Sequence, residues 1–306
     1  MITEMEIVKR VENIIDYNRA FGQETLHPLV SVIDFSTCNP LKLGSKDESV
    51  SFGFYAIFLK DVKCGDIKYG REYYDYQEGT LLFFAPYQVI RVETEDGYFQ
   101  PHGHALVFHP DIIQGTSLGR NIGNYSFFSY ETREALHLSE RERIIFRDTL
   151  SKIAYEIDHS IDKYSKKLIV SNIELILDYC ARFYDRQFHT RDNVNRGIIE
   201  QFEKYLVAYL YSKKPQKMGF PHVSYFAGIL NLSANYFGDL VKKETGRSAQ
   251  EYIQMKLIHV AKEKVFDTSK SISEIAYELG FKYPQHFSRM FKNQVGMSPA
   301  EFRSMN

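Results

Sequence analysis

The strongest constraint on the fold is an internal repeat in the last third of the chain. Residues 224–230 align with residues 273–279, and residues 237–242 align with residues 287–292 after one extra residue in the second turn. The spacing of Gly246 and Ser248 recurs in Gly296 and Ser298. A segment repeated at such a short period consists of copies of one small structural unit. The C-terminal third is therefore predicted to hold the same supersecondary structure twice.

Each copy has the apolar spacing of a short helix, a tight turn and a second helix. Apolar residues at i, i+3, i+4 and i+7 form one buried stripe on the first helix of each copy. These residues are Val223, Phe226, Ala227 and Leu230 in the first copy, and Ile272, Ile275, Ala276 and Leu279 in the second. Asn231 and Gly280 follow, and both residue types tolerate positive φ in a turn. The pattern predicts two helix-turn-helix units.

Capping signals place a long helix between the two copies. Ser248 and Glu251 form a capping-box pattern that opens a predicted helix over Ser248–Asp267. With these features, residues 197–306 resemble the DNA-binding domain of AraC/XylS-type transcription regulators. The resemblance is densest in residues 280–303, from Gly280-Phe281 through His286–Lys292 to Gly296–Arg303. It implies two helix-turn-helix units joined by a long helix, and double-stranded DNA as the partner.

The second helix of each copy is expected to enter the major groove, with about 34 Å between the two helices. Its polar positions are the candidate DNA contacts, namely Ser233, Asn235, Tyr236, Asp239, Lys242 and Lys243, and then Tyr283, Gln285, His286, Arg289 and Lys292. Asn235 or Gln285 suits adenine, and Arg289 suits guanine. Asp239 suits cytosine N4, or instead pairs with a lysine of its own helix. The lysines are expected on phosphates, with a solvated helix face as the alternative.

Charge is distributed unevenly along the chain. Residues 1–191 hold 22 basic and 28 acidic residues, whereas residues 192–306 hold 16 and 11. This asymmetry favours contact of the C-terminal third with a polyanion. The three cysteines, Cys38, Cys64 and Cys180, form no CxxC pair, no apolar run nears the 20 residues of a membrane span, and no signal peptide is apparent. We therefore expect a cytoplasmic protein that makes no membrane contact.

Residues 1–138 have the pattern of a β-domain, because short segments rich in aromatic and β-branched residues alternate with turn-forming residues. The predicted strands are Val30–Phe35, Phe52–Lys60, Lys68–Tyr76, Gly79–Ala85, Gln88–Thr94, Ala105–His109 and Ser126–Tyr130. Regularly spaced short strands predict a barrel or sandwich. Gly79–Pro86 resembles a turn of the cupin-like sensing barrel of the same family. That resemblance implies a domain that binds a small-molecule effector.

The period becomes helical after the capping-box pattern of Ser139 and Glu142. Residues 139–188 are predicted to form a helical hairpin, which the resemblance implies is a homodimer interface, and plain core packing is the alternative. Residues 189–196 are polar and are the predicted linker. The predicted fold is thus α+β with two domains: an N-terminal cupin-like β-barrel with a helical hairpin, and an all-α domain over residues 197–306.

Candidate effector contacts come from aromatic residues that suit a pocket wall and arginines that suit an anion. They are Phe54, Tyr69, Arg71, Tyr73, Phe83 and Arg91, with ordinary core packing as the alternative. His102, His104 and His109 suggest the metal ligands of cupin enzymes, but no Glu follows at the expected spacing. We therefore expect no metal and no cofactor.

The expected function is sequence-specific transcription activation under the control of an effector, without catalysis, and RNA polymerase is a further candidate partner. Two alternatives stay open. One is a constitutive DNA-binding regulator whose barrel only dimerises. The other is a metal-dependent cupin enzyme fused to a DNA-binding domain. Effector-dependent DNA affinity would support the first function, and stoichiometric metal would support the last.

Overall fold

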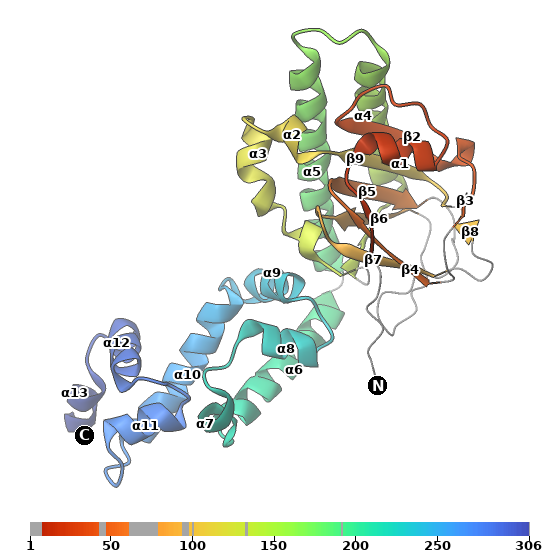
Figure 1. The fold of residues 1–306 in the computed structure, drawn as a ribbon. Coiled ribbons are helices and arrows are strands. Elements are labelled where there is room, and N and C mark those ends of the chain that lie inside the picture. Colours follow the sequence, from red (N-terminus) through yellow and green to blue (C-terminus); the bar gives the residue numbers. More distant parts are fainter. Residues whose placement is uncertain are drawn as a thin grey trace. The chain divides into compact units, whose positions relative to one another are not determined.

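A computed structural model describes residues 8–42, 47–60, 79–93, 98–99, 101–131, 134–190 and 192–305. The chain divides into two compact units, residues 1–189 and residues 190–306. Figure 1 shows an N-terminal unit of strands and helices and a C-terminal unit of helices alone. The chain is therefore an α+β protein in two parts, as the sequence predicts.

The N-terminal unit contains ten strands among its described residues. They are β1 (Val8–Val11), β2 (Val30–Asp34), β3 (Leu41–Lys42), β4 (Asp47–Phe52), β5 (Tyr55–Lys60), β6 (Thr80–Phe84), β7 (Val89–Glu93), β8 (Tyr98–Phe99), β9 (His104–Phe108) and β10 (Leu136–His137). The helices are α1 (Ile14–Ala20), α2 (Pro110–Ile113), α3 (Ser117–Asn121), α4 (Glu140–Asp158) and α5 (Ser165–Thr190), with 3-10 turns η1 (Phe35–Thr37), η2 (Ile122–Asn124) and η3 (Ser126–Ser129).

The described strands form three separate sheets. A five-stranded antiparallel sheet has the order β10-β6-β5-β9-β2, and a three-stranded sheet has the order β1-β4-β7 with β1 parallel to β4. Strands β3 and β8 make a third, two-stranded sheet. Among the described residues these pairings do not close a ring, so the sheets establish a β-domain but not the cupin-like barrel.

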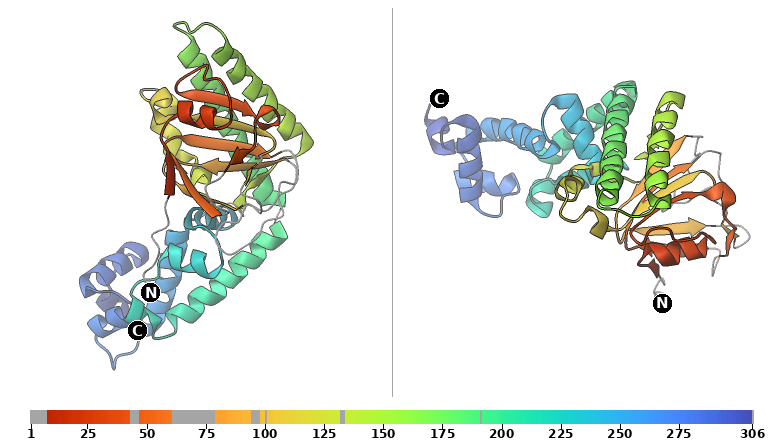
Figure 2. Two further views of the ribbon diagram at one scale, coloured as in Figure 1. Left: turned by 45° about the vertical axis from the view of Figure 1, so that its right-hand side comes forward. Right: turned by 90° about the horizontal axis from the view of Figure 1, so that it is seen from above.

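The five-stranded sheet is covered on both faces. Successive side chains of a strand point to opposite faces, and all five residues of β6 are buried. Leu82 and Phe84 pack into a core with Tyr17 of α1 and Ile90 of β7. On the other face Phe83 contacts Tyr184 of α5, with 6.1 Å between ring centroids. Figure 2 shows α4 and α5 along that face.

Helices α4 and α5 form the predicted hairpin, and polar contacts tie its open end together. The capping box at its start is present: Ser139 N donates to Glu142 Oε2 at 2.7 Å, and Glu142 N donates to Ser139 Oγ at 3.4 Å. Glu142 also accepts from Arg186 Nε of α5 at 2.8 Å. Because Arg186 donates to His137 O at 2.6 Å as well, the end of α5 is fixed to β10.

One predicted strand is wrong. Residues 126–130 form the 3-10 turn η3 and the residue after it, not a strand. Phe128 N donates to Tyr125 O and Tyr130 N donates to Phe127 O, both at 3.3 Å, so the backbone hydrogen bonds are local ones between residues three apart. Phe127 stacks on Tyr184, while Phe128 packs edge-on against Tyr55. The predicted strand Lys68–Tyr76 lies outside the described residues.

The C-terminal unit is made of eight helices among its described residues. They are α6 (Asp192–Leu210), α7 (Lys214–Met218), α8 (Val223–Ile229), α9 (Ala234–Thr245), α10 (Ala249–Val265), α11 (Ile272–Glu278), α12 (Pro284–Val295) and α13 (Pro299–Ser304). One continuous core runs through them, from Phe202 and Phe226 at the first copy to Phe287 and Phe291 at the second. Leu257 and Ala261 of α10 belong to that same core, so α10 packs against both copies.

The segment predicted as a linker, residues 189–196, is mostly helical. It comprises the end of α5 and the beginning of α6, on either side of Arg191, and it contains the boundary between the two units.

Among the described helices, none has both the length and the apolar character that crossing a bilayer requires.

Candidate nucleic-acid interface

The two repeated copies fold into the same helix-turn-helix, down to their turn hydrogen bonds. In the first turn Leu232 N donates to Ala227 O at 2.9 Å. In the second, Phe281 N donates to Ala276 O at 3.0 Å. The turn residue before each donor has positive φ, +54° at Asn231 and +89° at Gly280. The duplication inferred from sequence is therefore a duplication of backbone structure.

The second helices of the two copies, α9 and α12, end in the same way but begin differently. Ser233 Oγ accepts from Tyr236 N at 3.1 Å and caps α9, whereas Pro284 is the first residue of α12. Both helices end at a left-handed glycine, Gly246 or Gly296. These signals fix where each helix starts and stops, and so fix which side chains face outward.

Helix α12 presents all of its predicted DNA contacts to solvent. Tyr283, Gln285, His286, Arg289 and Lys292 are exposed, while Phe287 and Phe291 on the opposite side are fully buried. Arg289 has no ion-pair partner within the described part of the chain. Its guanidinium group is therefore available to an outside acceptor.

Helix α9 matches the prediction only in part. Asn235, Lys242 and Lys243 are exposed and Asp239 is half-buried, but Ser233 and Tyr236 are buried. Ser233 is occupied as the helix cap. Tyr236 precedes Leu240 by one helical turn and lies beside Phe237, so it joins the buried stripe. The exposed surface of α9 is thus narrower than the sequence predicts.

A carboxylate lies near one lysine of each helix, Lys242 of α9 and Lys292 of α12, at equivalent positions. Hydrogen bonds from the hydroxyl and backbone of Ser248 hold the pKa of Glu251 below its usual range, and Lys242 adds to the effect. Hydrogen bonds from Ser298 lower the pKa of Glu301 in the same way, with a contribution from Lys292. These carboxylates stay ionised at neutral pH, and the repeat therefore extends to its electrostatics.

Comparisons with known proteins agree with this geometry. The sequence profile of the family described as "Helix-turn-helix domain" matches residues 226–305. YfiF of Bacillus subtilis (strain 168), an uncharacterized HTH-type transcriptional regulator, is 30% identical over 243 residues, which make up 77% of this chain and 72% of YfiF. The chain belongs to the AraC/XylS-type family of transcription regulators.

Two other relatives match over a shorter part of the chain. The uncharacterized transcriptional regulatory protein YesN of the same Bacillus strain is 39% identical over 77 residues, 24% of this chain and 21% of YesN. AdaA of that strain, a bifunctional transcriptional activator/DNA repair enzyme, is 38% identical over 65 residues, 21% of this chain and 31% of AdaA. The chain thus spans about a fifth to a third of the length of these two relatives.

Two features of this AraC/XylS-type regulator were not predicted from its sequence. Helix α7 lies between α6 and the first copy, and its signal is only Pro215 at a helix start. Arg303 of α13 donates through Nε to Val265 O at 2.6 Å and so caps the end of α10. Arg303 is 38 residues from Val265 along the chain, so this contact depends on the path of the chain in space.

The candidate effector residues of the N-terminal unit are spread over different environments. Phe54 is fully buried in the core beside Tyr17, and Phe83 is buried between Phe127 and Tyr184. Tyr69, Arg71 and Tyr73 lie outside the described residues, as does the side chain of Arg91. The structure therefore places the two described candidates, Phe54 and Phe83, in the packed interior, each among different aromatic neighbours.

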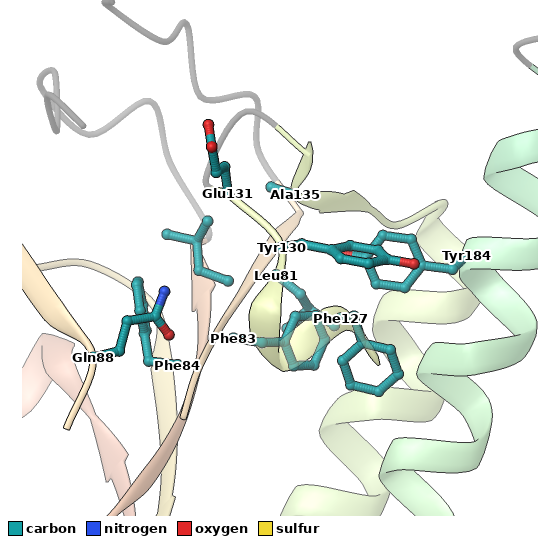
Figure 3. Close-up of a pocket in the computed structure, with 10 residues that line it drawn as sticks. Leu81, Phe83, Phe84, Gln88, Phe127, Tyr130, Glu131, Ala135 and Tyr184 are labelled. Atoms are coloured by element: carbon teal, nitrogen blue, oxygen red, sulfur yellow. The ribbon is translucent and has the colours of Figure 1, made fainter. Parts of the chain in front are cut away.

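Figure 3 shows a cavity where the sheet meets α5, with Phe83, Phe127 and Tyr184 clustered on one side. Its volume is about 10 Å³, room for about one water molecule. Pockets for small ligands measure roughly 300–1,000 Å³. As it stands, this cavity is too small for an effector.

His109, one of the histidines considered for metal binding, caps α2 by accepting from Asp111 N at 3.3 Å.

Proposed function

We propose that the protein binds double-stranded DNA sequence-specifically and regulates transcription from the bound site. The observation that carries the proposal is the pair of helix-turn-helix units that share one core through α10 and present polar helices α9 and α12. A connector that packs against both units keeps the two helices at a constant separation. Two recognition helices so held suit two successive major grooves on one face of B-DNA.

Within this proposal, the chemistry of each exposed side chain suggests which part of the DNA it contacts. Asn235 and Gln285 suit adenine, and Arg289 suits the O6 and N7 atoms of guanine. Asp239, which is half-buried, suits cytosine N4 less well than an exposed carboxylate would. Lys242, Lys243 and Lys292, near the ends of their helices, suit phosphates. We therefore expect the second unit to supply more of the base discrimination than the first.

Replacing Arg289 with alanine is expected to weaken specific binding by about 5- to 150-fold, the loss of one bidentate base contact worth about 1–3 kcal/mol. The preference for guanine at one operator position should relax as well. Selection of high-affinity duplexes from a random library, followed by titration with the wild type and the variant, measures both effects. Arg141→Ala, an exposed arginine on α4, is the matched control. Wild-type affinity in the Arg289 variant, with an unchanged base preference, would contradict the assignment.

We also propose that the N-terminal unit binds a small effector that modulates DNA affinity. Family membership supports this role. The candidate contacts are the buried rings of Phe54 and Phe83, together with Tyr69, Arg71, Tyr73 and Arg91, whose side chains lie outside the described residues. A thermal-shift screen of small metabolites, followed by DNA titration with each hit, tests the proposal. A hit that raises the melting temperature and changes the affinity supports it, and a regulator that responds to none is constitutive.

The hairpin of α4 and α5 is the proposed homodimer interface, because it exposes large apolar side chains at helical spacing. Leu168 and Leu175, two turns apart on α5, are 43% and 39% exposed, and Ile144 of α4 is 55% exposed. Leu168→Glu with Leu175→Glu is expected to yield a monomer by sedimentation while leaving the melting temperature near that of the wild type. A wild-type protein that sediments as a monomer at micromolar concentration would refute the interface.

We propose activation, through contact with RNA polymerase, as the regulatory outcome, and no catalytic role. The support is that the relative AdaA is named as a transcriptional activator. The repair activity in that name is a statement about AdaA alone. A promoter-reporter assay with the selected operator measures the direction of regulation.

A further inference from the structure

The turn of the second helix-turn-helix lies directly against a segment that precedes the first. We call residues 214–220, which comprise α7, Gly219 and Phe220, the strap. A Cβ atom at position 280 would lie 2.7 Å from both the carbonyl carbon and the carbonyl oxygen of Gly219, and 2.9 Å from the carbonyl oxygen of Pro215. Real Cβ atoms do not approach other atoms this closely. The contact is therefore possible only because residue 280 is glycine.

The positive φ of Gly280 does not by itself explain this glycine. The equivalent residue of the first turn is Asn231, which adopts φ +54° with a side chain in place. Gly296, at the end of α12, has φ +90° and would meet nothing within 4 Å of an added Cβ. Left-handed backbone in this turn therefore does not require glycine, although the wider φ of +89° at Gly280 adds backbone strain to any side chain. What position 280 cannot accept is the volume of a side chain beneath the strap.

The strap is attached to the first half of the C-terminal unit. Tyr209 Oη of α6 donates to Gly219 O at 3.0 Å, and Lys214 Nζ donates to Tyr225 Oη of α8 at 3.1 Å. Pro215, at the start of α7, is buried. On the other side, the ring of Phe220 packs edge-on against Phe281, with 5.9 Å between centroids. The strap therefore bridges the first half to the turn that leads into α12.

A second set of contacts fixes α11 to the connector. Lys264 Nζ of α10 lies 3.2 Å from Glu278 Oε2, and Lys270 Nζ lies 2.6 Å from Glu278 Oε1. Glu278 is only 21% exposed, so its two ion pairs are partly shielded from water. Helix α11 is thus held at its C-terminal end by α10 and at the following turn by the strap. Two separate attachments resist rotation of the second unit about α10, which one attachment would permit.

We propose that the strap fixes the position of α12 relative to α9, and that this makes the protein select operators by the spacing of their two half-sites. The inference rests on the proposed DNA-binding function and adds to it a determinant that touches no DNA. One inserted base pair moves a half-site by about 3.4 Å along the helix axis and rotates it by about 34°. A rigid pair of recognition helices cannot follow this change, whereas a pair freed from the strap can.

The test uses the full chain and the tightest duplex that the wild type selects from a random library. Derivatives of that duplex carry one base pair inserted or deleted between the two half-sites. Gly280→Asn keeps a residue type that the first turn already holds in left-handed backbone, but it pushes against the strap. Gly296→Asn is the matched control, because it makes the same change at nearly the same φ in open space. A groove of about 720 Å³, lined by Pro215, Tyr277 and Phe281, gives the displaced strap room to move.

For the wild type and Gly296→Asn, changing the spacing by one base pair is expected to weaken binding about tenfold or more, because the second helix loses its base contacts. For Gly280→Asn the loss should fall below about threefold, or the preferred spacing should shift. Equal spacing penalties in Gly280→Asn and Gly296→Asn would overturn the inference. If circular dichroism shows that Gly280→Asn does not fold, Phe220→Ala, which removes the ring contact of the strap, is judged by the same criterion. Failure of the wild type to select any duplex would refute the DNA-binding proposal instead.

Discussion

Replacing Phe287 with alanine is expected to lower the free energy of unfolding by about 3–5 kcal/mol and to remove specific DNA binding. Phe287 is fully buried on the inner side of α12, and its ring packs against Phe281 and Phe291, with centroids 5.4 and 5.7 Å away. Truncation removes these contacts and leaves a cavity in the shared core. Since domains are stable by only about 5–15 kcal/mol, the loss is a large fraction of the total.

Urea denaturation followed by circular dichroism measures this change, and duplex titration measures the loss of binding. Phe266→Ala is the control, since Phe266 is 39% exposed and the same truncation there is expected to cost about 1 kcal/mol or less. Hydrogen exchange of the α11 and α12 amides localises the effect. A Phe287 variant as stable as the wild type would show that α12 does not pack as described.

Raising the salt concentration from 50 to 200 mM is expected to weaken specific binding by about 40-fold for each bound chain. This figure takes three phosphate contacts, from Lys242, Lys243 and Lys292, each of which releases condensed counterions. The slope of log Kobs against log salt should then be about −2.7, because each contact contributes about −0.9. A homodimer on two sites should show about twice that slope.

The slope is measured by fluorescence anisotropy of a labelled duplex across the salt range. Lys292→Gln should make the slope shallower by about 1, whereas Lys167→Gln, an exposed lysine on α5, should leave it unchanged. A slope near zero would mean that none of the three lysines neutralises a phosphate. A slope that Lys292→Gln does not alter would exclude Lys292 alone.

The sequence predicted the C-terminal unit more completely than the N-terminal one, because the signals that define its helices lie between residues close together in the chain. Capping boxes such as Ser248–Glu251 and Ser298–Glu301 involve residues three apart, and both are present in the structure. The predicted connector, Ser248–Asp267, differs from α10 by two residues at its C-terminal end and by its capping residue at the other. Repetition strengthened each assignment, because two copies had to satisfy one pattern.

What sequence did not predict depends on contacts between distant residues. Tyr236 has the polarity of a surface residue, and only the position of its neighbours Phe237 and Leu240 shows that it is buried. Helix α7 has only five residues, too few to show the helical spacing of apolar residues. In the β-domain, the aromatic candidates for the effector site looked alike in sequence, and only the fold shows that Phe54 and Phe83 are buried. The proposed effector site is therefore the part of the molecule that was hardest to predict from sequence.

Because one continuous core runs through α10, neither of the two repeated copies is expected to fold independently of the other. Leu257 and Ala261 complete the interior of the C-terminal unit between Phe226 on one side and Phe291 on the other. Excising one copy would expose the apolar core side chains of the other copy to water. Calorimetry should therefore record a single melting transition for the two copies. A destabilising substitution in the core of one copy is therefore expected to lower the stability of the other copy as well.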